Sequence, residues 1–366
     1  MAEKKRGISR DLLIHPGETI GDLIVERDIA QKELARRVGI SEAFLSDVIN
    51  GKKDISKSLA RGLEYAFGVS SSFWLNLQAK YDAELLTVNE AETITEEEKA
   101  VLKTIREVVG YLRKKHVIPS DLTKEESVLS LRRIFGVSDL CNLKDFAADG
   151  AFRMSRNVSV VPEVTGAWLC MCKTMAVKTE PETAFSRDKT AELISELKKL
   201  MCKERKNPEP ELTHLLEKYG IAFSVMPHFR GAPVQGFISK KKDDTFQMVL
   251  TLRGASADIF WFSLMHELGH IVNGDLARQG YLMDMNDPAA ERKEQKADQF
   301  ASDALLRESD YSRFINEHGY KNIETIKSFA KSQGVPPFIV IGRLQKEKKI
   351  PYSYYSDLKP QYKWAD

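Results

Sequence analysis

Hydrophobic positions in the first ~80 residues recur at the spacing of short helices separated by tight breaks. Ile20, Leu23 and Ile24 share one face of a helix that opens at His15-Pro16-Gly17. Two helices follow over residues 31–39 and 41–51, and each closes with glycine, as helix C-termini prefer. Segments 56–68 and 71–85 complete a unit of five helices. The residues of the last helix that we expect to pack inward are Phe73, Trp74 and Leu77.

The helical pattern is interrupted over residues 88–100, which are acidic and poor in apolar side chains. We place a domain boundary there, because such a stretch is typical of a linker or an exposed helix start. From about 100 to 225 the pattern is mostly helical, with breaks at prolines. The sequence predicts five segments: a first domain (1–87), a linker or helical arm (88–120), a helical middle region (121–225), a C-terminal domain (226–350) and a tail (351–366).

The hydrophobic period changes after about residue 220. A strand at Tyr219–Phe223 precedes residues 234–254, which alternate around a charged turn and predict a β-hairpin with its second strand at 246–252. A helix over 261–273 follows, and a second long helix starts at Asp287-Pro288. The tail pair at 323–349 has the outline of another helix-turn-helix pair, which could be a second DNA-reading element. The predicted fold class is therefore mixed: an all-α N-terminal domain, a helical middle region and an α+β C-terminal domain.

Composition narrows the class of protein. Of the 366 residues, 42% are apolar and 30% are charged, which is typical of a globular protein. The formal net charge is only +2, so contact with nucleic acid must come from a local patch. No apolar run approaches the ~20 residues that cross a bilayer and no hydrophobic signal segment follows the first residues, so we expect a cytoplasmic protein. We expect reduced, buried thiols at Cys141, Cys170, Cys172 and Cys202, because no CxxC pair occurs.

The stretch WFSLMHELGHIVNGD (261–275) carries the chemistry of the C-terminal domain. His266 and His270 are four residues apart, so a helix presents both imidazoles on one face, where they can bind one zinc ion. Glu267 lies beside the open coordination position and can take a proton from water as general base.

A catalytic zinc site needs a third protein ligand and leaves one position open. Glu294 and Asp298 are an i, i+4 pair on the next helix, and Ala297 and Ala301 allow that helix to approach closely. We predict Glu294 as the third ligand and Asp298 as the acceptor that holds a ligand histidine in the right tautomer. Glu291, one turn earlier, is the competing ligand.

An isolated HExxH match is often inert, since five residues recur by chance. Here the histidine helix is apolar nearly all round, so His266, Glu267 and His270 would be costly polar groups unless a metal or hydrogen bonds satisfied them. This context favours a metal site.

The same residues carry a family resemblance. The segment FSLMHELGH (262–270), preceded by a hairpin and followed by Glu294-x-x-Ala297-Asp298-x-Phe300-Ala301, resembles the ImmA/IrrE family of zinc metallopeptidases. The resemblance covers about residues 145–345, including AFRMS (151–155) and the tail pair. It implies that the tail pair packs against the zincin core rather than reading DNA. It implies a zincin-like fold, zinc held by His266, His270 and Glu294, Glu267 as general base, and cleavage of regulatory proteins, often repressors.

This chain departs from many relatives at Lys296, where a second glutamate is common, and at Arg307-Glu308, where Met-Pro is common. These changes favour Glu294 as the ligand. They do not indicate which residues form the substrate cleft. The reaction would also need a donor to the oxyanion, for which the sequence offers His228, Arg230 and Tyr281 without favouring one.

The N-terminal helices over 31–38 and 41–50, joined by a turn at Gly39-Ile40-Ser41, have the spacing of a helix-turn-helix. Ser41 can cap the second helix, and Gln31 starts the first helix, where side chains often touch phosphate. The side chains that would face a major groove are Ser41, Glu42, Ala43, Ser46 and Asn50. Lys52 and Lys53 would meet the DNA backbone, with Arg36 and Arg37 as further candidates.

Residues 10–86 resemble the HigA-type antitoxins of the Cro/repressor-like helix-turn-helix class, most specifically at GIS, VINGKKDIS and FWLNLQ. That family implies operator binding as a homodimer and often a toxin partner. Glu42 and Asp47 on the reading helix oppose phosphate binding, although Glu42 can accept from a cytosine amino group. The alternative is a helix-turn-helix kept for docking or dimerisation.

Two functions follow. The first is a DNA-binding transcriptional regulator whose tethered zinc endopeptidase cuts a partner protein, such as a repressor, a toxin or another chain of its own kind. The second is an antitoxin-like repressor in which the zinc domain senses or merely scaffolds. Glu267 favours the enzyme, because a purely structural zinc site has no use for a base beside an open position.

Overall fold

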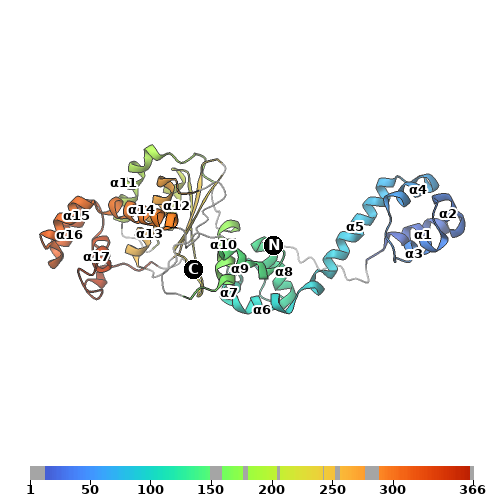
Figure 1. Cartoon of the computed structure of the whole chain (residues 1–366), viewed down its shortest axis with the longest axis horizontal. Helices are drawn as coiled ribbons and strands as arrows, with labels where there is room; N and C mark the ends of the chain where they lie inside the picture. The colour runs from blue at the N-terminus through green and yellow to red at the C-terminus, as the bar shows by residue number, and fades with distance from the viewer. Residues whose placement is uncertain are drawn as a thin grey trace. The chain divides into compact units, whose positions relative to one another are not determined.

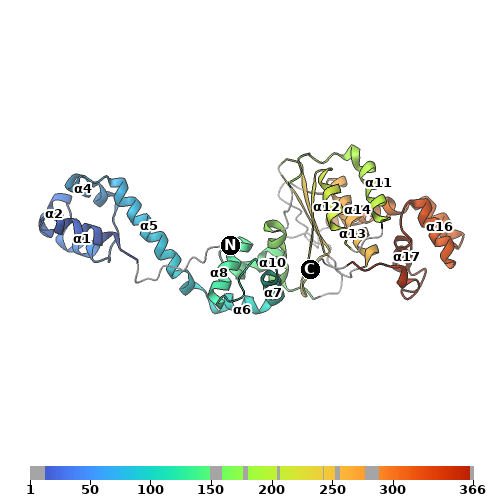
Figure 2. The ribbon, with the colours of Figure 1, turned by 180° about the vertical axis from the view of Figure 1, so that it is seen from behind.

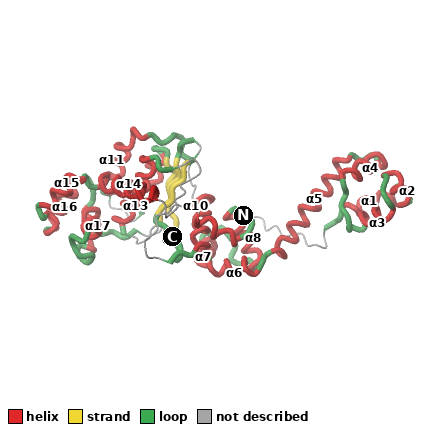
Figure 3. The backbone as a smooth tube through the Cα atoms, in the orientation of Figure 1, coloured by secondary structure: helices red, strands yellow, loops and turns green. Residues whose placement is uncertain are grey.

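The computed structural model describes residues 13–148, 159–175, 180–203, 207–241, 243–251, 256–276 and 288–362. The chain divides into two compact units, Met1–Thr95 and Glu96–Asp366. The division falls inside the acidic stretch at which the sequence predicts a boundary. The first unit is helical in its described part, and the strands lie in the second (Figure 3), so the mixed fold class is confirmed.

The described part of the N-terminal unit, from residue 13 on, contains five α-helices, as the pattern predicts: α1 (Pro16–Glu26), α2 (Gln31–Val38), α3 (Glu42–Ile49), α4 (Lys57–Phe67) and α5 (Ser71–Asn89), followed by a 3₁₀ turn, η2 (Glu90–Thr93). Their core contains Leu34, Leu45, Leu63 and Trp74, all without exposed surface. The expectation that Phe73 packs inward is wrong: its side chain is 44% exposed, because Trp74 turns the apolar face of α5 toward the core and Phe73 lies beside that face.

Helices dominate the first half of the C-terminal unit: α6 (Glu96–Thr104), α7 (Arg106–Lys114), α8 (Lys124–Phe135), α9 (Leu143–Ala148), α10 (Pro162–Thr174), α11 (Thr190–Met201) and α12 (Glu209–Glu217), with short 3₁₀ turns η3 (Leu140–Asn142) and η4 (Arg187–Lys189). Helix α6 is tied to α8 through the buried carboxylate of Glu98, which accepts from Arg132 Nε at 2.8 Å. Residues 96–114, predicted as part of a linker or arm, thus fold as helices within the second unit.

The four cysteines are free thiols. Cys170 and Cys172 are buried in α10, as predicted. Cys202 is exposed, contrary to expectation, because it lies at the C-terminal end of α11 near the surface. Cys141 is only partly buried.

A three-stranded sheet supports the site. The predicted hairpin is present: β2 (Gly236–Lys240) pairs antiparallel with β3 (Phe246–Thr251). Strand β1 (Ile221–Met226) pairs with β3 in parallel, so the order is β1-β3-β2 and β3 is the central strand. Every residue of β1 and β3 is buried, as expected of strands that are covered on both faces.

The two long helices of the site follow the sheet: α13 (Ala257–Asn273) and α14 (Pro288–Leu305). They make extensive contact and lie side by side in both views (Figures 1 and 2), and α13 also contacts β2 and β3. The helices α15 (Glu308–Asn316), α16 (Ile323–Gln333) and α17 (Pro337–Lys346) and the 3₁₀ turns η5 (Gly319–Lys321) and η6 (Ser356–Leu358) complete the unit.

The tail pair α16–α17 packs on this core, as predicted: Ile326, Ile341 and Leu344 are fully buried in the cluster that contains Trp261 and Leu264 of α13. The final segment also joins the core, because Tyr362 is buried and its hydroxyl accepts from Trp261 Nε1 at 2.7 Å. Among the described helices, none has the length and apolar character needed to cross a membrane.

Candidate metal centre and helix-turn-helix surface

Helix α13 carries His266, Glu267 and His270 into the interior. Their exposed fractions are 1%, 5% and 5%, and the apolar residues around them are buried as well. The 3.6-residue period places His266 and His270 one turn apart on one face. A buried helix with three such polar side chains is stable only if each of them finds a partner.

Helix α14 supplies that partner because it approaches α13 closely at Gly269. A β-carbon at Gly269 would lie 3.1 Å from Ala297 Cα and 3.1 Å from Phe300 Cδ1, so only glycine allows this spacing without movement of α14. Ala297 is fully buried at the contact. The close approach brings the Glu294 side chain under both imidazoles.

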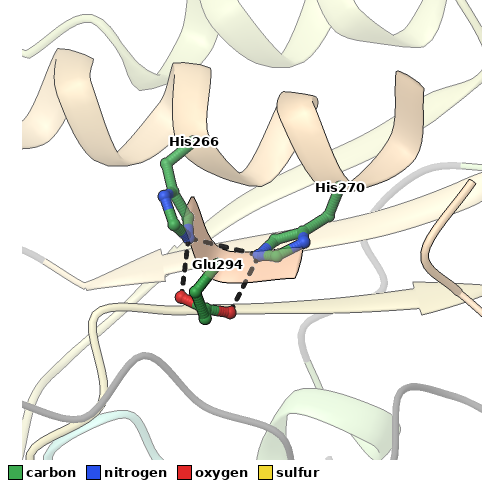
Figure 4. Close-up of side chains that lie close together, drawn as sticks. All are labelled: His266, His270 and Glu294. Carbon is green, nitrogen blue, oxygen red and sulfur yellow. Dashed lines mark hydrogen bonds and ion pairs between the residues drawn. The ribbon is translucent and has the colours of Figure 1, made fainter. Parts of the chain in front are cut away.

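Three ligand atoms converge between the helices (Figure 4). Glu294 Oε2 lies 3.2 Å from His266 Nε2, Glu294 Oε1 lies 3.1 Å from His270 Nε2, and the two Nε2 atoms are 3.2 Å apart. In a tetrahedral site with zinc–ligand bonds of ~2.0–2.1 Å, ligand atoms are separated by roughly 3.3 Å. The donor types and their spacing therefore fit a zinc ion with a three-ligand catalytic geometry.

Carboxylates orient both imidazoles from behind. His266 Nδ1 lies 2.8 Å from Asp298 Oδ1, the position predicted for Asp298, and His270 Nδ1 lies 3.0 Å from Asp275 Oδ2. With Nδ1 donating to a carboxylate, each Nε2 is the nitrogen left to face a metal, which would displace the proton that Nε2 carries without one. The sequence reasoning did not assign Asp275, although an acidic residue directly after Gly274, the glycine that ends α13, was a usable signal.

The electrostatics of the pocket favour a cation. Burial disfavours charge on His270, but hydrogen bonds with Asp275 and Glu294 outweigh it and raise the pKa of His270 to about 10. Burial likewise opposes ionisation of Glu294, yet its hydrogen bonds with His266 and His270 lower its pKa to about 2. The acidic side chains around the imidazoles thus create a negative potential that a divalent ion would neutralise.

Glu267 lies against the first residue of β2. A β-carbon at Gly236 would be 2.4 Å from Glu267 Oε1, so the carboxylate occupies the space that a side chain at position 236 would fill. The negative charge of Glu267 also raises the pKa of His270. Gly236 was not recognised from sequence, since an isolated glycine in a strand has several explanations.

Among the described residues, the other candidates do not belong to this group of ligand atoms. In the described part of the chain, the group able to hold a metal comprises His266, His270 and Glu294, while Glu291 is exposed on α14. His228 and Arg230 are exposed, and the backbone N–H of Arg230 donates to Glu107 at 3.0 Å. Tyr281 and the AFRMS segment (151–155) lie outside the described residues.

The helix-turn-helix places its predicted contact residues on an accessible surface. Ser41 caps α3, its hydroxyl accepting from the backbone N–H of Phe44 at 3.1 Å. Ser41, Glu42, Ala43 and Asn50 are exposed, and Ser46 is half-buried. Asn50 is held in place because its side-chain amide donates to Ser46 O at 2.8 Å.

Charge around α3 is partly compensated. Asp47, which would repel phosphate, is paired with Lys53 at 3.2 Å, and Lys53 Nζ also lies 4.8 Å from the centre of the Phe44 ring. Lys52 is exposed at the end of α3. Gln31 Nε2, at the start of α2, lies 3.5 Å from Glu42 O, so the beginnings of the two helices are neighbours.

Two family models match the chain: Helix-turn-helix over residues 20–74 and IrrE N-terminal-like domain over residues 233–344. The first match covers α2 and α3 with their turn. The second covers the hairpin, α13 and α14 and ends in α17. It corresponds to the C-terminal part of the 145–345 span in which the sequence resembles that family.

The relatives found cover the N-terminal part. Virulence-associated protein A' of Dichelobacter nodosus is 44% identical over 69 residues, which are 19% of this chain and 60% of that protein, so this chain spans less than two thirds of its length. The antitoxin HigA of Pseudomonas aeruginosa, solved with the higBA promoter, is 32% identical and covers 23% of this chain and 97% of its own, with a TM-score of 0.21. Another Pseudomonas aeruginosa protein, solved with its operator DNA, is 36% identical and covers 20% of this chain and 78% of its own, with a TM-score of 0.19.

Both resemblances in the sequence are confirmed by the family matches. The chain therefore carries a domain of the helix-turn-helix family in its N-terminal unit and an IrrE N-terminal-like domain, which belongs to a metallopeptidase family, in its C-terminal unit.

Proposed function

We propose that this protein is a DNA-binding transcriptional regulator whose C-terminal unit is a zinc-dependent endopeptidase that cleaves a regulatory partner protein. The observation that carries the proposal is the convergence of His266 Nε2, His270 Nε2 and Glu294 within 3.1–3.2 Å of one another, with the Glu267 carboxylate beside them. A structural zinc site is closed by four protein ligands. The described residues provide three, together with a potential base.

Each residue of the candidate centre would have its own role in peptide hydrolysis. His266, His270 and Glu294 would hold zinc, which when bound would polarise the peptide carbonyl and acidify water. Glu267 would accept a proton from the attacking water and return it to the leaving amine. Asp298 and Asp275 keep the imidazoles in the metal-binding tautomer, and burial of the α13 side chains keeps bulk water away from these groups.

The helix-turn-helix would bind operator DNA, most simply as a homodimer. The exposed face with Ser41, Glu42, Ala43, Ser46 and Asn50 is available for base edges, and Lys52 for phosphate. The pairing of Asp47 with Lys53 supports this proposal, because it reduces the repulsion between Asp47 and phosphate.

The enzymatic half is tested by metal analysis and by incubation of the full chain with host lysate, comparing the wild type with Glu267→Gln. Because glutamine keeps the size of glutamate but cannot accept the proton, we expect stoichiometric zinc in both proteins and cleavage only by the wild type. Mass spectrometry of new protein termini identifies the substrate. Zinc in both with identical lysate patterns would reject the peptidase and favour an antitoxin-like repressor whose zinc domain senses or scaffolds.

The DNA half is tested on the protein's own promoter. Lys52→Glu should weaken binding at every salt concentration and reduce the slope of log K against log[salt], because a phosphate contact and its counterion release are lost. Lys349→Glu, in the C-terminal unit, is the matched control and should leave the binding curve unchanged. Affinity that responds neither to salt nor to Lys52→Glu would contradict a phosphate-anchored complex.

A further inference from the structure

We infer that a cavity of about 470 Å³ beside the candidate metal centre receives a large apolar side chain of the substrate, next to the bond that is cleaved. This inference rests on the proposed peptidase function and adds a substrate class to it. It is carried by the position, the lining and the charge of the cavity.

The cavity lies along the same two helices, α13 and α14, as the candidate metal centre. Pairing of His266 with Asp298 and of His270 with Glu294 shows that α13 and α14 run antiparallel. The cavity is lined by Ser263 on α13, one turn before Glu267, and by Ser302 on α14, one turn after Asp298. It therefore begins about 5 Å, one helical turn, from the residues proposed for catalysis. Gln235, next to the Gly236 that supports Glu267, lines it as well.

The inner surface is mainly apolar. Ile259 and Phe262 of α13, Leu305 of α14, Leu306 directly after it and Ile339 of α17 contribute to it. A cavity of ~150 Å³ is sufficient for a benzene ring, so this one accepts any aromatic or long aliphatic side chain. Ile259 is 40% exposed, which places it where the cavity meets solvent.

Most charged residues of the wall are paired with other charged groups. Lys359 Nζ lies 2.7 Å from Asp258 Oδ2, and Arg343 is held by Glu308 at 2.6 Å and Glu347 at 2.9 Å. Arg343 also stacks on Tyr311, 3.8 Å from the ring centre, and Lys346 Nζ lies 4.4 Å from the centre of the Phe262 ring. Because the ion pairs compensate their own charge and Lys346 adds positive charge, a cationic side chain in the cavity would be desolvated without a matching partner. The wall thus selects against positive charge and in favour of apolar surface.

The expected discrimination is large. A pocket that differs by one methylene already separates ligands by about 10–200-fold, so phenylalanine or leucine should exceed alanine by at least ~10-fold in binding. Filling the cavity should remove this preference.

Binding is measured on the full chain by saturation-transfer NMR with N-acetyl-phenylalaninamide, N-acetyl-leucinamide and N-acetyl-alaninamide as probes. We expect signal from the first two and little from the third. Ser302→Trp, which fills the cavity from half-buried Ser302, should abolish the signal, and Ser332→Trp on the exposed surface of α16 should retain it. If Ser302→Trp does not fold, Ile259→Glu introduces a charge at the more exposed rim and should have the same effect. Equal signals from the three amides, or full signal in the folded variants, would overturn the inference.

Cleavage provides the second readout and separates this inference from the peptidase proposal. The zinc-loaded chain is incubated with a mixture of synthetic decapeptides, and cleavage sites are identified by mass spectrometry. We expect large apolar residues to be enriched on one side of the cleaved bond and Ser302→Trp to shift the preference toward alanine and serine. Cleavage without preference on either side would overturn the inference and leave the peptidase proposal standing. Amide binding without any cleavage would support the cavity as a site for apolar side chains and count against the peptidase.

Discussion

Single residues decide whether the candidate centre is chemically competent. His266 and His270 reach one point only because Nδ1 of each is held by a carboxylate, Asp298 or Asp275. The position of Glu267 is also constrained, because its carboxylate occupies the space that a side chain at position 236 would fill. Metal binding and base position are therefore separable properties, which predicts variants that lose one of them and keep the other.

Gly236→Ala is such a variant. Its β-carbon would meet Glu267 Oε1 at 2.4 Å, and because that atom ends a flexible side chain, the carboxylate should move while the fold persists. We expect unchanged zinc content and a fall in kcat of roughly 100-fold, the lower range of the contribution of a general base. Peptide hydrolysis and metal analysis check this.

Gly110→Ala on α7, where an added β-carbon has no neighbour within 4 Å, is the matched control and should keep full activity. Wild-type kcat in Gly236→Ala would show that the contact with Gly236 does not position the base.

Whole elements set the distance between the ligands. Two of the proposed ligands come from α13 and one from α14, so the spacing of these helices fixes the size of the candidate metal site. The sheet holds α13 from the other side through β2 and β3, whose buried apolar residues belong to the same core.

Gly269→Val tests this packing. Its side chain would press on the backbone of Ala297, which cannot yield as a side-chain end can, so α14 must move and carry Glu294 away from the imidazoles. We expect zinc affinity to fall by about 10-fold or more, the range observed when support of metal ligands is disturbed. Competition with a chromophoric chelator measures the affinity.

The control is Gly110→Val, which bears the same valine on a helix without neighbours within 4 Å of the added carbon. If both variants bound zinc as tightly as the wild type, the close approach of α13 and α14 would not be what defines the site.

The molecule as a whole consists of two units, each with a core of its own. One core contains Leu45 and Trp74, the other Trp261 and Leu264, and the division between the units lies at Thr95–Glu96. Separate cores predict separate unfolding transitions, and a ligand raises only the transition of the unit that binds it.

Calorimetry of the full chain should therefore show two unfolding transitions. Zinc should raise the midpoint temperature of one of them. At a free zinc concentration 100-fold above Kd, the stabilisation should be about 2.7 kcal/mol. Leu45→Ala, at a fully buried position of the first core, should lower the free energy of unfolding of the N-terminal unit by about 2–5 kcal/mol and should shift only the other transition. A single transition that responds to both changes would contradict independent units.

Much of this organisation follows from local rules. The 3.6-residue period places His266, Glu267 and His270 together, proline and glycine mark helix ends, and alternation marks the hairpin at 234–254. These predictions hold because backbone geometry fixes the relation between neighbours in sequence. The helix-turn-helix and its cap at Ser41 were predictable for the same reason.

The remaining features depend on which segments meet in space. Sequence spacing leaves Glu291 and Glu294 as rival ligands, and only the packing of α14 at Gly269 turns Glu294 toward both imidazoles. Three further features depend on contacts whose geometry the spacing in the sequence does not fix. They are the parallel pairing of β1 with β3, the contact of Gly236 with Glu267 and the hydrogen bond between His270 and Asp275. Periodicity gives the face on which a residue lies, but the partner of that face is chosen by the packing of the whole domain.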